Sequence, residues 1–407
     1  MSTTTAPTNI TESAPQTPTE FPTWFADLQK QAWQEYLDAP MPTRRDETWR
    51  FGNLKQLDFS DFNESESESN GIAYKIPEVP EGVICLPFAE ALQQHGDLVK
   101  AHFMKHNTKL GSAKFAALHK ARVKSGLFVY VPDGVKVEKP IEVTHTLSGA
   151  SSAVFPHTLI VTGKNAEVSV LDRFVSADED DAGLCIAVND LIAGDGSTLK
   201  YCAVQELNLS SRMIQVNATT VGRDANALAF TLNSGAQWVR NEALSRLDGE
   251  GAHSDMLSCS IPTGTQQFDQ RTYQHHAAQH TNSDLLYKNT LYGNSKTVFS
   301  GIIFVDEGAH YTDAYQTCRN LMMSDTVEAN SMPGLQINAD QVKCSHGSTA
   351  SSIDDEEIYY LCARGITPRQ ARRLIAIGFS AEPIERMRND RLEDVVMEAV
   401  ERKFASI

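Results

Sequence analysis

The sequence lacks the features by which proteins span membranes or bind nucleic acids. Its apolar runs have the length of a strand, as in Leu127–Val131, well short of the ~20 residues of a membrane-spanning helix. Lys and Arg number 36 against 52 Asp and Glu, which gives a formal net charge of −16. Such a balance opposes binding to a phosphate backbone or an anionic leaflet. We therefore expect neither a nucleic-acid partner nor a membrane partner.

Signals for export and for disulfide or metal frameworks are also missing. The first basic residue is Lys30, and no apolar segment follows Met1, so a secretion signal is not indicated. The seven cysteines are Cys85, Cys185, Cys202, Cys259, Cys318, Cys344 and Cys362. An odd number without Cys-x-x-Cys pairs fits neither a disulfide framework nor a conventional zinc or ferredoxin-type site. The sequence predicts a cytoplasmic protein with reduced thiols.

Common catalytic signatures are not found either. The sequence contains no complete phosphate-binding loop of the GxxxxGK[ST] type, no GxSxG nucleophile elbow and no HExxH zinc motif. The motifs therefore indicate none of these catalytic classes.

The composition divides the N-terminal part of the chain into two segments. Residues 1–21 are rich in Thr, Pro, Ser and Glu and bury too little to offset their ordering entropy, so we expect a disordered tail. Residues 22–125 are expected to form a mainly helical domain. Thr23 is the candidate cap of its first helix, with Phe25, Leu28, Ala32 and Tyr36 at helical spacing and Pro40 beyond its end. The acidic stretch Ser60–Gly71 is expected to be an exposed loop.

From residue 126 to residue 352 the chain consists of short β-rich runs broken by Gly, Asp and Asn. The turn glycines Gly134, Gly163, Gly194, Gly222 and Gly249 follow one another at steps of roughly 29, 31, 28 and 27 residues. A quasi-regular period in this range is typical of a stacked solenoid. The pattern favours a mainly β protein with a parallel β-helix core. A large β-sandwich with coincidental turn spacing is the alternative.

Residues 353–407 are predicted to form a small helical region. Asp354 and Glu357 have the spacing of a capping box, and the first helix is expected to stop at Gly365. Thr367, Pro368 and Gln370 begin the next helix, which Gly378 is expected to end. The last helix places Leu392, Val395, Val396, Ala399 and Val400 on one face. This region is too small for a large core of its own and should dock on another surface.

Two groups of residues are candidate metal ligands. His275, His276 and His280 lie in a β-rich run, where His276 and His280 would be about 13 Å apart. That spacing favours polar side chains on the solenoid surface over one shared metal. Cys344 and His346, by contrast, fall on the same face of a strand. A thiolate and an imidazole are plausible iron ligands, but they need further ligands from elsewhere. The alternative is that Cys344 packs in the core and His346 forms local hydrogen bonds.

The segment from Tyr287 to Phe379 resembles the SufB/SufD family of iron–sulfur assembly scaffolds, and Trp49-Arg50-Phe51 weakly resembles its N-terminal region. Lys343-Cys344-Ser345-His346-Gly347 is similar to the D-type member of the family. A B-type chain would carry its cluster-building cysteine where this chain has Asp325–Asn330.

The resemblance implies a right-handed parallel β-helix between helical ends, in a subunit that is not itself an enzyme. It implies pairing with SufB through the C-terminal end of each β-helix and binding of the SufC ATPase by residues 353–407. Candidate SufC contacts are Ile358, Leu361, Leu374 and Ile375, some of which must face the region's own core. His346, and more weakly Cys344, would then help to hold a nascent iron–sulfur cluster at the SufB–SufD interface.

Several alternatives stay open at the level of sequence. One is a carbohydrate-active β-helix enzyme, which would need carboxylates and basic residues clustered in a groove along stacked turns. Another is a structural paralogue in which His346 has no chemical role. The sequence also leaves open whether reduced flavin binds the complex and whether the isolated chain forms a homodimer.

Overall fold

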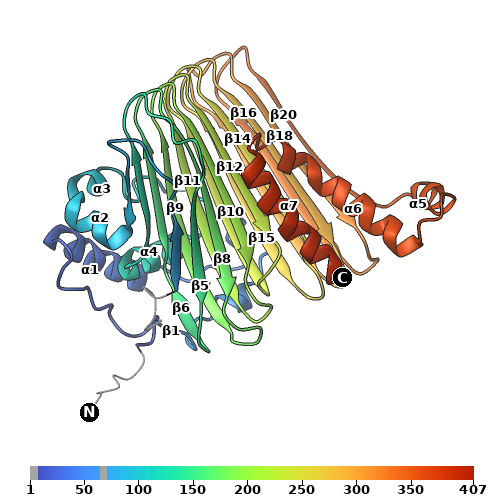
Figure 1. The fold of residues 1–407 in the computed structure, drawn as a ribbon, viewed down its shortest axis with the longest axis horizontal. Helices are drawn as coiled ribbons and strands as arrows, with labels where there is room; N and C mark the ends of the chain where they lie inside the picture. Colours follow the sequence, from blue (N-terminus) through green and yellow to red (C-terminus); the bar gives the residue numbers. More distant parts are fainter. Residues whose placement is uncertain (1–7, 65–70, 108) are drawn as a thin grey trace.

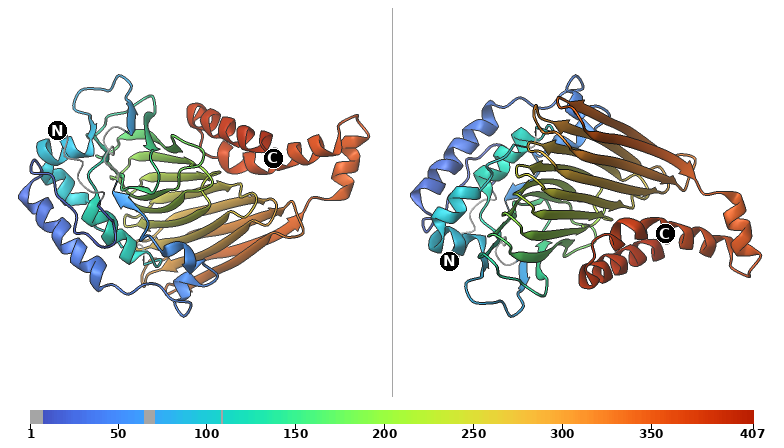
Figure 2. Two further views of the ribbon diagram at one scale, coloured as in Figure 1. Left: turned by 90° about the horizontal axis from the view of Figure 1, so that it is seen from below. Right: turned by 90° about the horizontal axis from the view of Figure 1, so that it is seen from above.

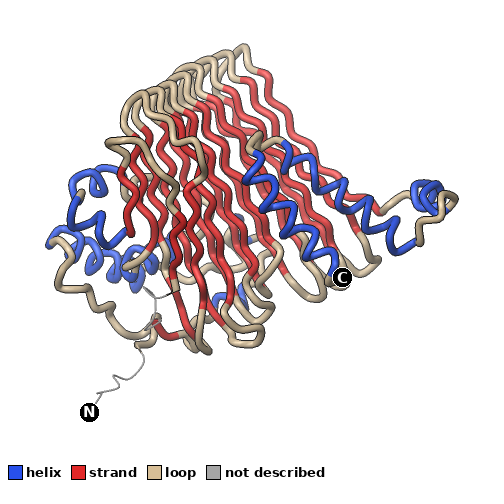
Figure 3. The backbone as a smooth tube through the Cα atoms, in the orientation of Figure 1, coloured by secondary structure: helices blue, strands red, loops and turns tan. Residues whose placement is uncertain are grey.

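A computed structural model describes residues 8–64, 71–107 and 109–407. Its core is a β-solenoid of about eight coils, each of which contributes one strand to each of two facing sheets (Figures 1 and 3). Neighbouring coils pair in parallel, so the prediction of a parallel β-helix is confirmed and the β-sandwich alternative is wrong. Among the described residues no helix is long and apolar enough to cross a membrane.

From β7 onward, successive strands belong to the two sheets in turn. In the described part of the chain, sheet A has the order β19 (Glu328–Ile337), β17 (Lys296–Val305), β15 (Gln267–His276), β13 (Trp238–Leu247), β11 (Arg212–Val221), β9 (Gly183–Ala193), β7 (His157–Thr162), β4 (Gly126–Val131) and β3 (Ile84–Pro87), with β6 (Ser152–Val154) beside β9 and β1 (Asn63–Glu64) beside β6. Sheet B has the order β2 (Ile72–Lys75), β5 (Ile141–Leu147), β8 (Glu167–Ser176), β10 (Thr198–Glu206), β12 (Asn226–Asn233), β14 (His253–Ser260), β16 (Asn282–Leu291), β18 (Asp313–Met322) and β20 (Lys343–Ser352).

The glycine period reflects turns that stack on one another. The backbone N–H of Gly222 donates to the Ala193 carbonyl 2.8 Å away, and that of Gly249 donates to the Val221 carbonyl at 3.2 Å. A Cβ atom on Gly249 would lie 2.0 Å from the Arg223 backbone nitrogen in the coil before it. At Gly194 and Gly249 glycine is required because successive coils approach too closely for a side chain, whereas at Gly134 it is favoured by a φ of 73°.

The strands alternate between the interior of the solenoid and its outer faces. In β5, Ile141, Val143 and Leu147 point inward and are buried, whereas Glu142 and Thr144 are only half-buried. Because side chains alternate with a period of two, every strand has one face toward the interior of the solenoid and one toward its outside. Part of the outer face of each sheet is also buried, under the terminal helices.

N-terminal helices cover the outer face of sheet A (Figure 2). They are α1 (Thr23–Asp38), α2 (Phe88–Gln94), α3 (Gly96–His102) and α4 (Ala113–Arg122), with 3-10 turns at Glu47–Trp49 and Leu54–Leu57. Phe25 of α1 and Phe88 of α2 pack on Phe128 and Leu159, which face outward from sheet A. The N-cap of α1 is Pro22, not Thr23 as predicted, and the helix ends at Asp38, just before Pro40.

This N-terminal part also contains strands that the sequence did not predict. The strands β2 and β3 pair antiparallel with β5 and β4, so they close the first end of both sheets. The N-terminal tail was expected to bury too little to become ordered, yet Ile10 is fully buried beside Phe62. Residues 1–7 of that tail and residues 65–70 of the acidic stretch lie outside the described residues.

Two C-terminal helices, α6 (Pro368–Glu385) and α7 (Asp390–Ala405), cover the outer face of sheet B. The helix before them, α5 (Asp355–Cys362), does not lie on the sheet (Figure 1). The predicted apolar face of α7 is buried against sheet B, where its side chains join Phe230, Leu257 and Leu286 in one cluster. The predicted start of α6 at Thr367 and Pro368 is confirmed, and Thr367 and Gln370 form a capping box there.

Two predicted details of these helices are wrong. Gly378 lies inside α6 and does not end it, because a glycine within a helix costs only about 1 kcal/mol and packing on sheet B outweighs that cost. Asp354 caps α5 by accepting from the Glu356 backbone N–H, without a capping box to Glu357. The predicted stop is displaced slightly, because α5 ends at Cys362 and Gly365 follows in the left-handed region with φ of 86°. The domain boundaries drawn from the sequence remain predictions.

Candidate functional site

The last coil of the solenoid ends in two open strand edges. Strand β19 is hydrogen-bonded only to β17, and β20 only to β18, among the described residues. Each of these edge strands is 10 residues long. Long edges with free backbone N–H and C=O groups invite pairing with another chain unless they are protected. The first end of the solenoid, by contrast, is closed by β2 and β3.

Cys344 and His346 lie on this open coil. In β20, Cys344 pairs with Ala314 and His346 pairs with Gln316, both of which are buried inside the solenoid. The two side chains therefore share the inward face of the last coil, as the alternation predicted. Because no further coil follows, this face is open and His346 is exposed.

The two candidate ligands differ in their surroundings. Cys344 is half-buried and packs on Ile303, Val305, Ala309 and Ala314. Burial, with the nearby Asp313 carboxylate, raises the pKa of the Cys344 thiol above its ordinary value. The thiol must therefore lose a proton before it can bind a metal, whereas the exposed imidazole of His346 is directly accessible. Their roles as ligands remain a prediction.

A further thiol, which sequence reasoning missed, lies one coil deeper. Cys318 of β18 faces inward, and the side-chain amides of Asn289 and Asn320 lie 3.8 Å from its sulfur. Burial raises the pKa of this thiol to about 12. The alternation along β18 already places Cys318 on the same face as Ala314, so that pattern could have identified it. A protonated thiol among amide donors is consistent with a packing role.

The three clustered histidines do not converge. His276 is buried, with its two ring nitrogens 2.7 Å from the Thr281 hydroxyl and 2.8 Å from the Ser283 hydroxyl. The Nε2 atom of His275 lies 2.8 Å from an Asp306 carboxylate oxygen, and the ring of His280 stacks on that of Tyr311. Among the described residues no group of three or more His, Cys, Asp or Glu side chains is arranged to hold a metal ion.

The predicted SufC contacts have unequal exposure. Ile358 and Ile375 pack partly into the core shared with sheet B, and Leu361 is half-buried. Leu374 is 51% exposed. Tyr359 and Tyr360 of α5, which the sequence did not single out, are 76% and 57% exposed. Helix α5 buries none of its residues and projects away from the solenoid (Figure 1).

A hollow of about 690 Å³ lies on the C-terminal helices near α5. Its floor contains Tyr292, Met323 and Phe404, and its rim contains Arg369, Arg372 and Arg373. An apolar floor with cationic rim residues suits a partner that presents apolar and acidic side chains.

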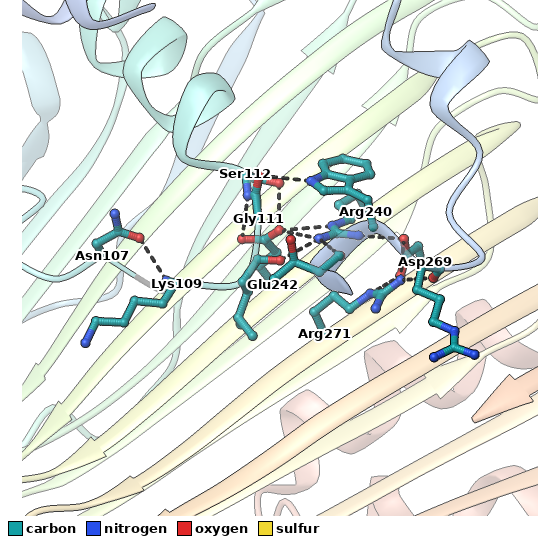
Figure 4. A network of polar contacts seen from close by, with 12 residues as sticks. Asn107, Lys109, Gly111, Ser112, Arg240, Glu242, Asp269 and Arg271 are labelled. Carbon is teal, nitrogen blue, oxygen red and sulfur yellow. Dashed lines mark hydrogen bonds and ion pairs between the residues drawn. The ribbon is translucent and has the colours of Figure 1, made fainter. Parts of the chain in front are cut away.

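The Trp49-Arg50-Phe51 segment lies over a buried network of charges on the outer face of sheet A (Figure 4). The Arg240 guanidinium bonds to Glu242 at 2.8 Å and Asp269 at 2.6 Å, and it lies 3.9 Å from the centre of the Trp49 ring. Arg271 bonds to Asp269 and donates to the Arg50 carbonyl. The network attaches the N-terminal region to β13 and β15, so its residues hold the fold together.

These features define a class of protein: a parallel β-solenoid that is covered on both outer faces and closed at its first end, with polar and thiol side chains at an open last coil. A family model described as "SUF system FeS cluster assembly, SufBD core domain" matches residues 145–379, more than half of the chain. A second, described as "SufBD protein N-terminal region", matches residues 63–143. The chain belongs to the SufBD family of iron–sulfur cluster assembly proteins.

Similar proteins include both types of the family. The chain is 27% identical to the iron–sulfur cluster assembly protein SufD of Bacillus subtilis, with 94% of each chain covered. It is also 27% identical to SufD of Escherichia coli, with 90% of each covered. Identity to SufB of Bacillus subtilis is 24%, over 88% of this chain and 85% of that protein.

Proposed function

We propose that this chain is the D-type, non-catalytic scaffold subunit of a cytoplasmic assembly with SufB and SufC. It pairs with a SufB chain through β19 and β20 and presents His346 to a nascent iron–sulfur cluster. The single observation that carries this proposal is the open last coil with His346 on its accessible inward face.

Pairing through the last coil would satisfy both open edges. A partner strand beside β19 or β20 takes up free backbone N–H and C=O groups and extends the sheet. It also covers Leu335 and Ile337, which face the open interior and are each 39% exposed. The SufB partner thus supplies the coil that this chain lacks.

The cluster is cargo at this interface. His346 offers a ring nitrogen lone pair to iron, and Cys344 offers a thiolate once its proton has left. Two side chains do not complete the ligands of a cluster, so the partner chain supplies the rest. His346 is the stronger candidate because it is accessible without a change in the fold.

The C-terminal helices are the proposed SufC-binding surface. Tyr359 and Tyr360 of α5 and Leu374 of α6 replace Ile358 and Ile375 as the central contacts, because exposed side chains are available to a partner and packed ones are not. The hollow rimmed by Arg369, Arg372 and Arg373 adjoins this surface and adds cationic contacts.

The test is anaerobic co-expression of the tagged chain with SufB and SufC, followed by a count of subunits, iron and sulfide. His346→Ala should leave both partners bound and lower the iron counted per assembly, because the cluster loses one of its ligands. Ser348→Ala is the matched control, since Ser348 is exposed on the same face of β20. Unchanged iron in His346→Ala would favour the structural-paralogue alternative, and loss of both partners from the wild type would overturn the assignment.

A second pair of variants tests the SufC surface. Leu374→Glu should abolish SufC binding while SufB stays bound. Leu209→Glu changes a residue that is also exposed, between β10 and β11, and should leave SufC bound. Equal loss of SufC in both variants would contradict the proposed surface.

The carbohydrate-enzyme alternative gains little support. A groove of about 600 Å³ crosses the outer face of sheet B and contains Asp255 and Asp284. Their carboxylates are paired, Asp255 with His253 at 3.2 Å and Asp284 with Arg386 at 2.7 Å. The groove lies under the turn from α6 to α7, where the Asp284–Arg386 pair helps to attach the helices and the Asp255–His253 pair stays within β14.

A further inference from the structure

One carboxylate near the end of helix α6 pairs with cations on two strands of sheet B, in addition to the apolar packing of the helix. Glu382 lies 2.6 Å from the Lys288 ammonium of β16 and 3.8 Å from the Arg319 guanidinium of β18. It also bonds to Arg386 on its own helix at 3.2 Å. Hydrogen bonding from Lys288 is the first cause that lowers the pKa of the Glu382 carboxyl. Glu382 therefore joins two neighbouring strands of the solenoid to α6.

Lys288 makes this attachment rigid. Its ammonium is buried and donates to the Phe379 carbonyl at 2.9 Å, and it lies 4.5 Å from the centre of the Phe379 ring. A buried cation with one carboxylate partner resists separation, because parting them leaves an unpaired charge in the interior.

Strands β16 and β18 each carry an asparagine directly after the residue that Glu382 contacts. Lys288 pairs with Arg319 in register, and Asn289 pairs with Asn320. Because side chains alternate, the two asparagines face inward where the two cations face outward. Asn289 donates to Asn320 at 2.9 Å, and Asn320 donates to the backbone carbonyl of Thr349 in β20 at 3.1 Å.

The attachment thus extends from α6 through β16 and β18 to β20. Thr349 lies three residues after His346 on the same strand. The other end of α6, at Pro368, is 14 residues from Glu382, which is about 20 Å at 1.5 Å per residue. A force applied to the exposed end of α6 would act through this long arm on the coil that carries His346.

We propose that Glu382 is a positioning residue that couples the C-terminal helices to the open coil, so that movement of α6 shifts β18 and β20 and with them His346. The coupling rests on the proposed function for its biological role, since SufC is the partner that would move α6. All the contacts from Glu382 to β20 lie within this chain, so the coupling can be tested on the isolated protein.

The first experiment measures hydrogen exchange of the isolated full-length chain. Glu382→Gln should speed amide exchange in β18 and β20 by about tenfold, equivalent to ~1.4 kcal/mol of local opening free energy, and leave β4 and β9 unchanged. Arg319→Ala should speed exchange mainly in β20, and its side chain is half exposed, so its loss leaves no buried charge unpaired.

Glu206→Gln is the matched control. Glu206 of β10 binds Arg402 of α7 at 2.8 Å and Arg173 at 3.1 Å, so it also joins a C-terminal helix to sheet B, but far from the open coil. It should leave exchange in β20 unchanged. Faster exchange in α6 with β20 unchanged in Glu382→Gln, or equal effects of Glu382→Gln and Glu206→Gln on β20, would overturn the coupling.

The second experiment repeats Glu382→Gln in the co-expressed assembly. SufC should stay bound while iron and sulfide per assembly fall severalfold, which separates coupling from binding. Iron and sulfide at the wild-type level would overturn the coupling. If the wild-type chain binds no SufC, the proposed function fails, and the exchange result on the isolated chain still decides whether α6 and β20 are coupled.

Discussion

The two ends of the solenoid are built from the same kind of coil but filled differently. In the first coils most of the interior is one large apolar cluster that includes Leu127, Ile141 and Val143, with the buried His145–Asp172 pair as a polar exception. Strands β2 and β3 close this end, and helices α1 to α4 cover its outer face. Burial of apolar surface dominates folding free energy, so these coils supply much of the stability.

In the last coils the apolar clusters are smaller, and amides and hydroxyls line much of the interior between them. Gln274 bonds to Gln316 and Ser283, and Asn289 bonds to Asn320. Polar groups inside a fold contribute less net stability than apolar packing, but they fix geometry through directed bonds. The closed end of the solenoid is therefore stabilised mainly by apolar packing, whereas at the open end directed polar bonds fix the geometry of an exposed surface.

The largest loss of stability is expected when the ion pairs that attach the N-terminal region to sheet A are broken. Arg240→Met leaves Glu242 and Asp269 as buried carboxylates that have each lost a partner, and should cost about 3–5 kcal/mol in free energy of unfolding. Urea denaturation measures it. Arg246→Met on the same strand removes an exposed pair with Asp248 and should cost less than about 1 kcal/mol. Similar losses in both variants would contradict the structural role of the network.

A smaller loss of stability is expected when an apolar side chain is truncated, and the loss should differ between the two ends of the solenoid. Leu127→Ala in the closed end should cost about 2–5 kcal/mol, because the residue is fully buried. Leu335→Ala at the open end should cost less than about 1 kcal/mol in the isolated chain, because it is already 39% exposed. Denaturation with and without bound SufB would sharpen the comparison, since the cost at Leu335 should rise only in the complex.

The pH dependence of stability tests the polar interior. Burial lowers the pKa of His276 from 6.5 to about 3, so the unfolded chain binds the extra proton first as the pH falls. Stability from this group is complete above pH ~6.5 and is lost toward pH ~3, with a slope of at most about 1.4 kcal/mol per pH unit. His276→Asn should show a shallower loss in urea midpoints between those values. An unchanged slope would mean that His276 takes up its proton without unfolding.

The smallest effect on stability is expected at the proposed site. His346→Ala removes an exposed side chain from the last strand and should change the free energy of unfolding by less than about 0.5 kcal/mol. Thermal and urea denaturation of the isolated chain measure it. A large loss of stability would assign His346 to the fold, and its effect on iron could then not be interpreted as ligation.

The sequence by itself determined the repeat, because stacked turns need glycine at a fixed period and strands need alternation. It also determined the shared face of Cys344 and His346 and the apolar face of α7, since both follow from local periodicity. Each of these patterns lies within one continuous segment of the chain and does not depend on contacts with residues far away in the sequence.

Only the tertiary structure decided what depends on long-range contact. Gly378 continues a helix because sheet B packs against it, and Ile10 is ordered because Phe62 and the N-terminal cluster enclose it. The antiparallel closure by β2 and β3 follows from where those short segments meet the first coil. Glu382, Lys288 and Arg319 are separated by tens of residues, and no local pattern brings their charges together; the packing of α6 on β16 and β18 does.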